Sequence, residues 1–258
     1  MTRRNPNISP EPSGDLPGDC RNNAGPHHPS DATVASDDGI ATELRGFGLL
    51  GLTSFLLILI TLLLGSNPFV PLAAIVVLIW AWWSRTPWSD IGFARPRSWA
   101  ASLVIGIAFG ISFKFLMKAV VMPLLGADPV NQAFHYLAGN RAALPGAIWM
   151  MIVVAGFGEE VVFRGYLFER LGKLLGSALW TKPFIVLLTA VGFGLAHYSN
   201  QRLAGVEQAA IVGLVFGAIF ARTRRLWMLM TAHAAFDLTA LAMIFLDAES
   251  DVAHLIFK

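Results

Sequence analysis

From Phe47 onward, the chain consists mainly of apolar runs close to the length that a membrane-spanning helix requires. A bilayer core about 30 Å thick needs roughly 20 apolar residues in an α-helix. The expected spans, about seven in number, lie near residues 47–64, 69–84, 99–125, 145–164, 183–199, 204–221 and 226–246. Breakers such as Asn67-Pro68 and Asp128-Pro129 separate them. The pattern predicts an all-α fold, a polytopic transmembrane helical bundle.

Composition divides the chain into two parts. Hydrophobic residues make up 55% of the 258 residues and charged residues only 14%, whereas soluble domains carry about 25% charged residues. Residues 1–43 differ, because they are rich in Pro, Gly, Asp, Asn and Ser and show almost no apolar periodicity. Such a segment cannot bury enough apolar surface to offset its ordering entropy. We therefore expect a disordered N-terminal tail at 1–43 and a transmembrane helical domain at 44–258.

The distribution of Lys and Arg orients the expected bundle. The positive-inside rule places loops rich in these residues in the cytoplasm. Basic residues gather in the stretches 85–97, 164–182 and 222–225, after the second, fourth and sixth spans, and the alternate loops hold few. The rule predicts a cytoplasmic N-terminus and an external C-terminus. Because membrane topology accounts for the basic residues, nucleic acid is not an expected partner.

Two adjacent carboxylates, Glu159 and Glu160, interrupt the fourth apolar run, and Arg164 follows them. An ionisable group within a span costs about 2.5–3.5 kcal/mol even on lenient insertion scales, so it is usually paired, functional or both. Residues four apart share a helix face, so we expect Glu160 to pair with Arg164. Glu159 then has no partner nearby in the sequence, and such a carboxylate suits proton transfer. The alternative is that both acids are solvated at the end of a span.

Two later spans also carry ionisable residues. Phe193 and His197 are four apart, which places an aromatic ring beside the imidazole. His233 and Asp237 are also four apart, and an acid one turn from a histidine can accept its ring proton and fix its tautomer. The alternatives are an interfacial histidine and a buried polar pair that joins two helices. Because the three sites fall on separate, otherwise apolar spans, we expect them to meet in an intramembrane cavity.

The three sites together resemble the motifs of a known family, the CPBP intramembrane proteases, which comprise the type II CAAX prenyl proteases and the bacteriocin-processing, or ABI, enzymes. The resemblance covers about residues 85–246 and implies an all-helical membrane protease. The motifs, in chain order, are Glu159-Glu-x-x-x-Arg164, Phe193-x-x-x-His197 and His233-x-x-x-Asp237.

The resemblance also implies a role for each site residue. Glu159 is the expected general base, which together with His197 activates a water for attack on a peptide carbonyl. Glu160 and Arg164 are expected to support and orient the site, and His233 to stabilise the oxyanion.

Asp237 departs from the pattern, because many members, including the eukaryotic Ras-converting enzyme, have Asn at this position. An ionised Asp cannot donate a hydrogen bond to an oxyanion. We therefore expect Asp237 to orient His233, or to be protonated.

Zinc ligation by Glu159, His197 and His233 stays open, since three protein ligands and an open position describe catalytic zinc sites. Without a His-Glu-x-x-His helix, a reaction with no metal or other cofactor is favoured.

The expected partner is a membrane protein or peptide substrate in the lipid bilayer, for which the eukaryotic precedent is a prenylated one. The expected location is a bacterial cell membrane.

A proton-coupled transporter and a non-catalytic membrane scaffold remain as alternatives, although transporters commonly carry internal repeats and none is evident. Lys114 and Lys118 share a face of the third span and are not assigned to the active site. Reaching toward the outer surface is easy for Lys118 and strained for Lys114, and Glu207 is a candidate partner.

Overall fold

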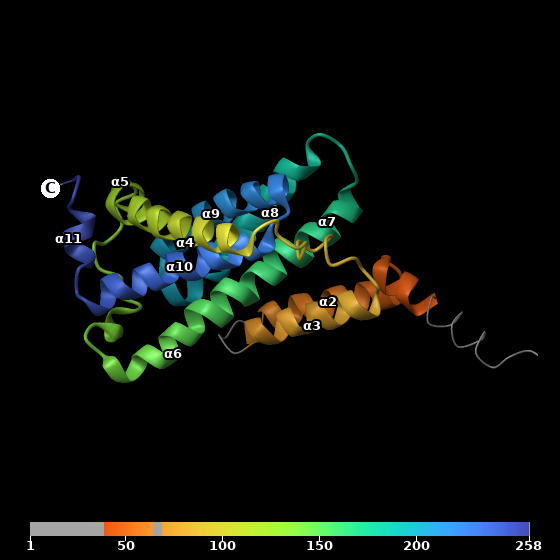
Figure 1. Ribbon diagram of the computed structural model, residues 1–258, viewed down its shortest axis with the longest axis horizontal. Helices are drawn as coiled ribbons and strands as arrows, with labels where there is room; N and C mark the ends of the chain where they lie inside the picture. The colour runs from red at the N-terminus through yellow and green to blue at the C-terminus, as the bar shows by residue number, and fades with distance from the viewer. Residues whose placement is uncertain (1–38, 64–68, 258) are drawn as a thin grey trace, which may run out of the picture. The chain divides into compact units, whose positions relative to one another are not determined.

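The computed structural model describes residues 39–63 and 69–257, and it is helical almost throughout (Figure 1). Residues 1–38 of the expected disordered tail lie outside the described residues. Its last residues, from 39, instead belong to a short helix, Gly39–Arg45. Within the described ranges, the β-structure is limited to one isolated bridge between Phe93 and Arg225. The expected all-α class is confirmed for this part of the chain.

Ten α-helices follow the short first helix in the described residues. Two of them, α4 and α6, continue into π-helical segments, and two 3-10 turns lie between α5 and α6. The α-helices are α2 (Leu49–Leu63), α3 (Phe69–Trp83), α4 (Trp99–Leu116), α5 (Met122–Leu124), α6 (Leu144–Trp149), α7 (Phe168–Leu175), α8 (Thr181–Ala196), α9 (Tyr198–Thr223), α10 (Leu226–Phe245) and α11 (Glu249–Ala253). The π-helical segments are η1 (Met117–Val121) and η4 (Met150–Leu167), and the 3-10 turns are η2 (His135–Leu137) and η3 (Arg141–Ala143).

Four continuous helical segments are long and apolar enough to cross a membrane, namely Trp99–Leu124, Arg141–Leu175, Tyr198–Thr223 and Leu226–Phe245. Gly39–Arg45 and Leu49–Thr61 form a fifth if this pair, bent by 51°, is one span. Val70–Trp83 and Thr181–Ala196 are apolar but shorter. The expected count of about seven spans is therefore not confirmed. Hydropathy locates apolar runs, but it does not measure how long a continuous helix each run forms.

The expected fourth span has an unexpected backbone. Residues Met150–Leu167 form a π-helix of 18 residues, whereas the sequence predicted an α-helix. A π-helix bonds each N–H to the carbonyl five residues back; it is rare and occurs mostly as single turns, often at functional sites. This segment, η4, carries Glu159, Glu160 and Arg164.

Helix α10 packs against α4 and η4, while α8 pairs with α9 and α2 with α3 (Figure 1). Small residues permit these approaches. A Cβ atom added at Gly110 of α4 would lie 2.1 Å from the carbonyl oxygen of Ala232 in α10. One added at Gly156 of η4 would lie 2.9 Å from the Cβ of Ala234. Because these glycines have no side chain, α10, which carries His233, lies close to both neighbouring helices.

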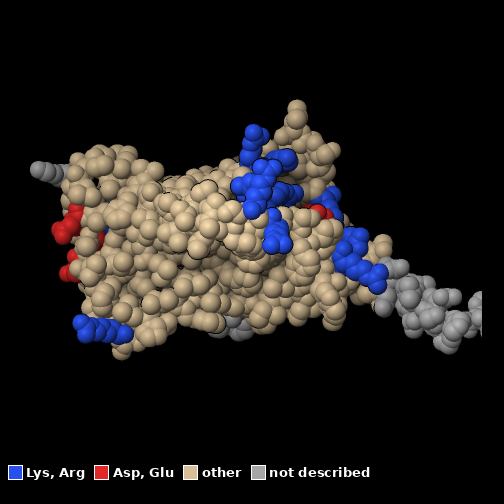
Figure 2. All heavy atoms as spheres, in the orientation of Figure 1, with Lys and Arg blue, Asp and Glu red and all other residues tan. Residues whose placement is uncertain are grey.

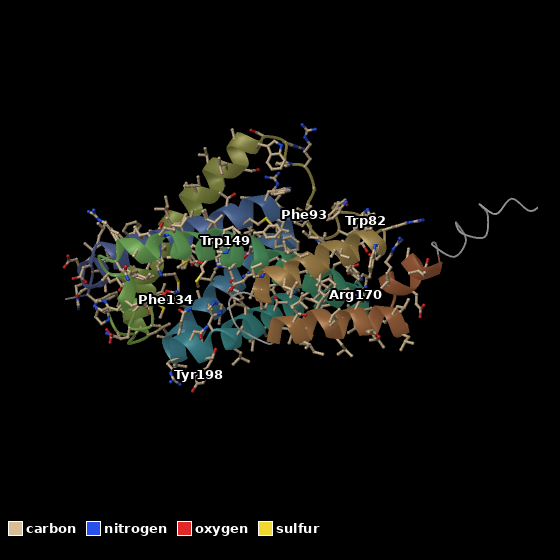
Figure 3. All side chains as sticks on the ribbon, turned by 90° about the horizontal axis from the view of Figure 1, so that it is seen from below. Trp82, Phe93, Phe134, Trp149, Arg170 and Tyr198 are labelled. Carbon is tan, nitrogen blue, oxygen red and sulfur yellow. The ribbon has the colours of Figure 1, made fainter. Side chains whose placement is uncertain are left out.

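The two ends of the helices differ in charge. Figure 2 shows most of the visible Lys and Arg near α7 and the connection between α3 and α4, and acidic side chains at the opposite end. Arg170 of α7 is buried at the basic end, where it donates to the carbonyls of Arg45 and Gly46. Figure 3 shows Tyr198, the first residue of α9, toward the other end. Exposed Arg side chains of the basic end include Arg95, Arg97, Arg222, Arg224 and Arg225.

Candidate active site

Glu160 is the centre of a buried polar cluster. Its Oε1 atom accepts one hydrogen bond from Nη1 of Arg164 at 2.7 Å and another from Nδ1 of His233 at 2.8 Å. All three side chains are almost fully buried. The expected pair of Glu160 and Arg164 is therefore present. The contact with His233 comes from a residue 73 positions away, and no spacing in the sequence indicates it.

Aromatic rings enclose the Arg164 guanidinium. Its central carbon lies 4.7 Å from the ring centre of Phe193 and 5.6 Å from that of Phe216. Cations are attracted to the faces of such rings, and more strongly where water is excluded. Phe216 also meets the His233 ring edge-on at 5.6 Å. The two rings thus hold both partners of Glu160 in place.

The second nitrogen of His233 faces two carboxylates. Its Nε2 atom lies 3.7 Å from Oε2 of Glu159 and 3.6 Å from Oδ2 of Asp237. Both distances exceed the range of a good hydrogen bond. Asp237 was expected to orient His233, but the hydrogen bond that orients the ring comes from Glu160. Because a carboxylate can only accept, Nδ1 carries a proton and Nε2 is left facing Glu159 and Asp237.

His197 lies at the junction of α8 and α9. Its Nδ1 atom is 2.8 Å from the carbonyl oxygen of Phe193, and because a carbonyl only accepts, Nδ1 is the donor and Nε2 of the neutral ring keeps its lone pair. The Phe193 ring lies edge-on at 4.8 Å, as the four-residue spacing predicted. His197 is half-buried and within electrostatic range of Glu159 and Asp237.

Glu159 has capacity for further hydrogen bonds. Its side chain is 15% exposed, and its Oε2 atom has no hydrogen-bond partner among the described residues. Glu160 on the same helix is fully buried; its Oε1 atom accepts two hydrogen bonds, while its Oε2 atom also has no partner among the described residues. The two adjacent carboxylates therefore occupy different environments, as their spacing from Arg164 predicted.

The geometry does not fit the zinc alternative. In the part of the chain that the structure describes, no three His, Cys, Asp or Glu side chains are arranged to hold a metal ion. Glu159, His197 and His233 are the residues that would have to converge, and Nε2 of His233 lies 3.7 Å from Oε2 of Glu159. We therefore assign no chemical step to a metal.

Lys118 has a different environment from the one expected. It is buried, and its Nζ atom donates to Oε1 of Glu249 at 2.9 Å and to the carbonyl of Pro129 at 2.7 Å. Glu207, the partner suggested by depth along the helices, is not the residue that neutralises it. The true partner is 131 positions away and lies on α11, so local spacing could not identify it.

An apolar groove borders the cluster. It has a volume of about 840 Å³ and lies between α4 and η4, with α10 beneath it. Its lining includes Phe157, two residues before Glu159, and both Ala234 and Leu238, the residues that follow His233 and Asp237. None of the six site residues lines the groove itself, so the groove and the site share η4 and α10 but occupy different faces of α10.

Comparison with known proteins supports the motifs. The family described as "Type II CAAX prenyl endopeptidase Rce1-like" matches residues 141–239, a stretch that includes all six expected site residues. An uncharacterized protein of Bacillus subtilis (strain 168), YyaK, is 28% identical over 136 residues, which are 50% of this chain and 44% of that protein. The match thus spans less than half the length of this relative.

No solved structure gives a significant match to the chain. The apolar helices nevertheless agree with the family match, and together they indicate an integral membrane protein. Residues 141–239, which hold the three motifs, are thus similar to the Rce1-like family of type II CAAX prenyl endopeptidases.

Proposed function

We propose that this protein is an intramembrane endopeptidase that hydrolyses a peptide bond in a membrane-associated protein or peptide. The observation that carries the proposal is the convergence of Glu159, Glu160 and Asp237 on His233, within a stretch that matches an endopeptidase family. A polar pair that only joins two helices needs one hydrogen bond, whereas this cluster also keeps the Glu159 carboxylate and Nε2 of His233 available.

Glu159 is the proposed general base. A water bound between its carboxylate and Nε2 of His197 gives a proton to Glu159, and the oxygen attacks the carbonyl carbon of the substrate. The available oxygen of Glu159 and the lone pair that Phe193 leaves on Nε2 of His197 support this step. General acid–base catalysis of this kind contributes typically about 10²–10⁴-fold to a rate.

His233 is the proposed stabiliser of the oxyanion. With Nδ1 held by Glu160, the ring in its protonated form directs Nε2–H toward the developing negative charge. Arg164 balances the charge of Glu160, and the carboxylate of Asp237, 3.6 Å from Nε2, adds negative charge that favours the protonated ring. Glu159 then returns its proton to the leaving nitrogen, the C–N bond breaks, and the products are a carboxylic acid and an amine, which become a carboxylate and an ammonium when the acid gives its proton to the amine.

The apolar groove supports a substrate that arrives from the bilayer. Its volume of about 840 Å³ is within the roughly 300–1,000 Å³ of pockets that bury a small ligand. The groove is lined by residues of η4 and α10, the segments that carry Glu159 and His233, and by α4, and these segments belong to helices long enough to span a membrane. An apolar segment or a prenyl group in this groove would place an adjoining peptide bond near Glu159.

Proteolysis of membrane-anchored reporter proteins tests the proposal. Membranes with the wild-type chain should cleave a reporter, while Glu159→Ala and His197→Ala should each lower the rate by about 10²-fold or more. Asp251→Ala and His254→Ala are matched controls, because both side chains are exposed on or next to α11, and they should cleave normally. If the two site variants cleave like the wild type, the chain is not this protease. Proton flux into the same vesicles would then test the transporter alternative.

A further inference from the structure

Lys114 places a buried ammonium group next to the candidate site, and the proposed reaction does not use it. The residue is 6% exposed. Its Nζ atom donates to Oε1 of Gln208 at 3.1 Å and lies 4.8 Å from the ring centre of Phe236. No carboxylate of the described residues comes within ion-pair distance of it, whereas Lys118 is paired with Glu249 at 2.9 Å. A charge in such a place is costly and is usually functional.

Lys114 lines a cavity of about 470 Å³ with both apolar and polar residues in its lining, which we name the Lys114 pocket. Its walls come from α4 and η1, the connection after α5, the start of α9, the end of α10, and α11. The volume is within the range of sites that bind small ligands or short peptide segments. Side-chain amides are frequent in the lining, which includes Asn131, Gln132, Asn200, Gln201 and Gln208.

The charges of the Lys114 pocket leave a positive excess. Lys114, Lys118 and Arg202 line it together with Asp128 and Glu249. Glu249 is already bonded to Lys118 and to the backbone N–H of Asn131, so the lysine without a counter-ion is Lys114. A single ammonium with amides around it suits a singly charged carboxylate. The two acids in the lining would repel a doubly charged phosphate.

The Lys114 pocket adjoins the catalytic cluster. Lys114 contacts Phe236 and is within electrostatic range of the next residue, Asp237. The stretch 200–202, also in the lining, begins three residues after His197. Arg202 has φ 57° and ψ −154°, a strained conformation of the kind that occurs at ligand sites. Tyr198 in Figure 3 marks this junction of α8 and α9.

We propose that the Lys114 pocket is a substrate subsite that binds a carboxylate of the peptide, with Lys114 as its counter-ion and the amides as partners of the peptide backbone. This inference rests on the proposed function, and it makes Lys114 a specificity-determining residue. The carboxylate comes either from the end of the peptide chain or from an acidic side chain. Both sources present the same group to Nζ of Lys114, which has no carboxylate of the described residues within ion-pair distance.

Three short peptides separate the sources in a binding assay on the purified full-length protein. The probes are N-acetyl-Leu-Leu-Ala with a free carboxylate, the same peptide as its amide, and N-acetyl-Leu-Leu-Asp-amide. A bound peptide raises the temperature of unfolding. We expect the free acid or the Asp-amide to raise it and the plain amide to have little effect. Binding of the free acid alone assigns the chain end, and binding of the Asp-amide assigns a side chain.

Variants then test Lys114 itself. Lys114→Gln can still bond Gln208 but has no charge, and it should weaken binding of the carboxylate peptide by about ten- to a hundredfold, the range for a hydrogen bond to a charged group. Lys114→Arg should retain part of the binding. Lys182→Gln is the matched control, because Lys182 is exposed at the start of α8 and lies outside the pocket. Equal binding of all three peptides by the wild-type protein would overturn the inference, even if the variants do not fold.

The KM of the wild-type enzyme separates failure of the subsite from failure of the proposed function. A cleaved reporter peptide should have a KM about tenfold or more lower as the acid than as the amide, and Lys114→Gln should remove that difference. Cleavage with equal KM values would refute the subsite and leave the protease. Lys114-dependent binding of the peptide without any cleavage would refute the proposed protease function and leave the subsite.

Discussion

His233 donates from Nδ1 to Oε1 of Glu160 at 2.8 Å, and this hydrogen bond joins α10 to η4. The same oxygen accepts from Arg164. One carboxylate therefore balances a buried arginine and also fixes which nitrogen of the histidine faces the site. Replacing Glu160 is therefore expected to lower both stability and activity, whereas replacing its neighbour Glu159 should lower activity alone.

Replacing Arg164 with Leu should destabilise the protein strongly. The substitution leaves the buried carboxylate of Glu160 without its arginine, and breaking a buried ion pair costs about 3–5 kcal/mol. Unfolding in detergent, followed by tryptophan fluorescence, measures the change. Arg222→Leu is the control, because Arg222 is exposed near the end of α9, and it should change the free energy of unfolding by no more than about 0.5 kcal/mol. Equal effects of the two variants would show that the pair does not support the fold.

Glu159→Gln should separate catalysis from folding. The Oε2 atom of Glu159 has no hydrogen-bond partner in the described part of the chain, so the amide should leave the free energy of unfolding within about 1 kcal/mol of the wild type. Hydrolysis should fall by about 10²–10⁴-fold, because an amide cannot accept the proton of the water. Reporter cleavage and unfolding are measured on the same preparation. Glu160→Gln, in contrast, should lower both, and full activity of Glu159→Gln would exclude Glu159 as the base.

Gly110→Ala should disturb the approach of α4 to α10. The added Cβ would lie 2.1 Å from the carbonyl of Ala232, which precedes His233, so the helices must separate. Overpacking of this kind costs about 1–3 kcal/mol, and reporter cleavage should decrease with it. Gly192→Ala is the matched control, since nothing lies within 4 Å of a Cβ at Gly192 in α8. That variant should keep its stability and its activity.

Strong chelators should leave the proposed hydrolysis intact. The proposed steps use only carboxylates and imidazoles, so cleavage should persist after treatment with EDTA or phenanthroline. A zinc protease in the same detergent serves as the positive control and should lose its activity. Loss of cleavage that returns when zinc is added back would reject the metal-independent mechanism and favour ligation by Glu159, His197 and His233.

The single cysteine tests the predicted orientation. Cys20 is the one cysteine of the chain, and with a cytoplasmic N-terminus it should react with a membrane-impermeant maleimide only after cells are opened. In a Cys20→Ser background, Leu179→Cys should behave in the same way, because Leu179 is exposed and follows α7. Tyr136→Cys, exposed between α5 and α6, should react in intact cells. The opposite pattern would invert the topology.

The sequence by itself determined the features that depend on local spacing. Apolar runs identified a helical membrane protein, and four-residue spacing identified the neighbours Glu160 with Arg164 and Phe193 with His197. Such pairs lie on one helix, and helical geometry brings them together however the helices pack. The π-helical form of η4 did not separate Glu160 from Arg164, because in the structure they remain in contact.

Only the tertiary structure decided which residues meet across helices. It assigned the hydrogen bond of His233 to Glu160 rather than to Asp237, and the charge of Lys118 to Glu249 rather than to Glu207. It also left Lys114 in the lining of a cavity. These contacts depend on how α4, η4 and α10 rotate and approach one another, which packing at positions such as Gly110 and Gly156 controls. Hydropathy and spacing along one chain contain no measure of that rotation.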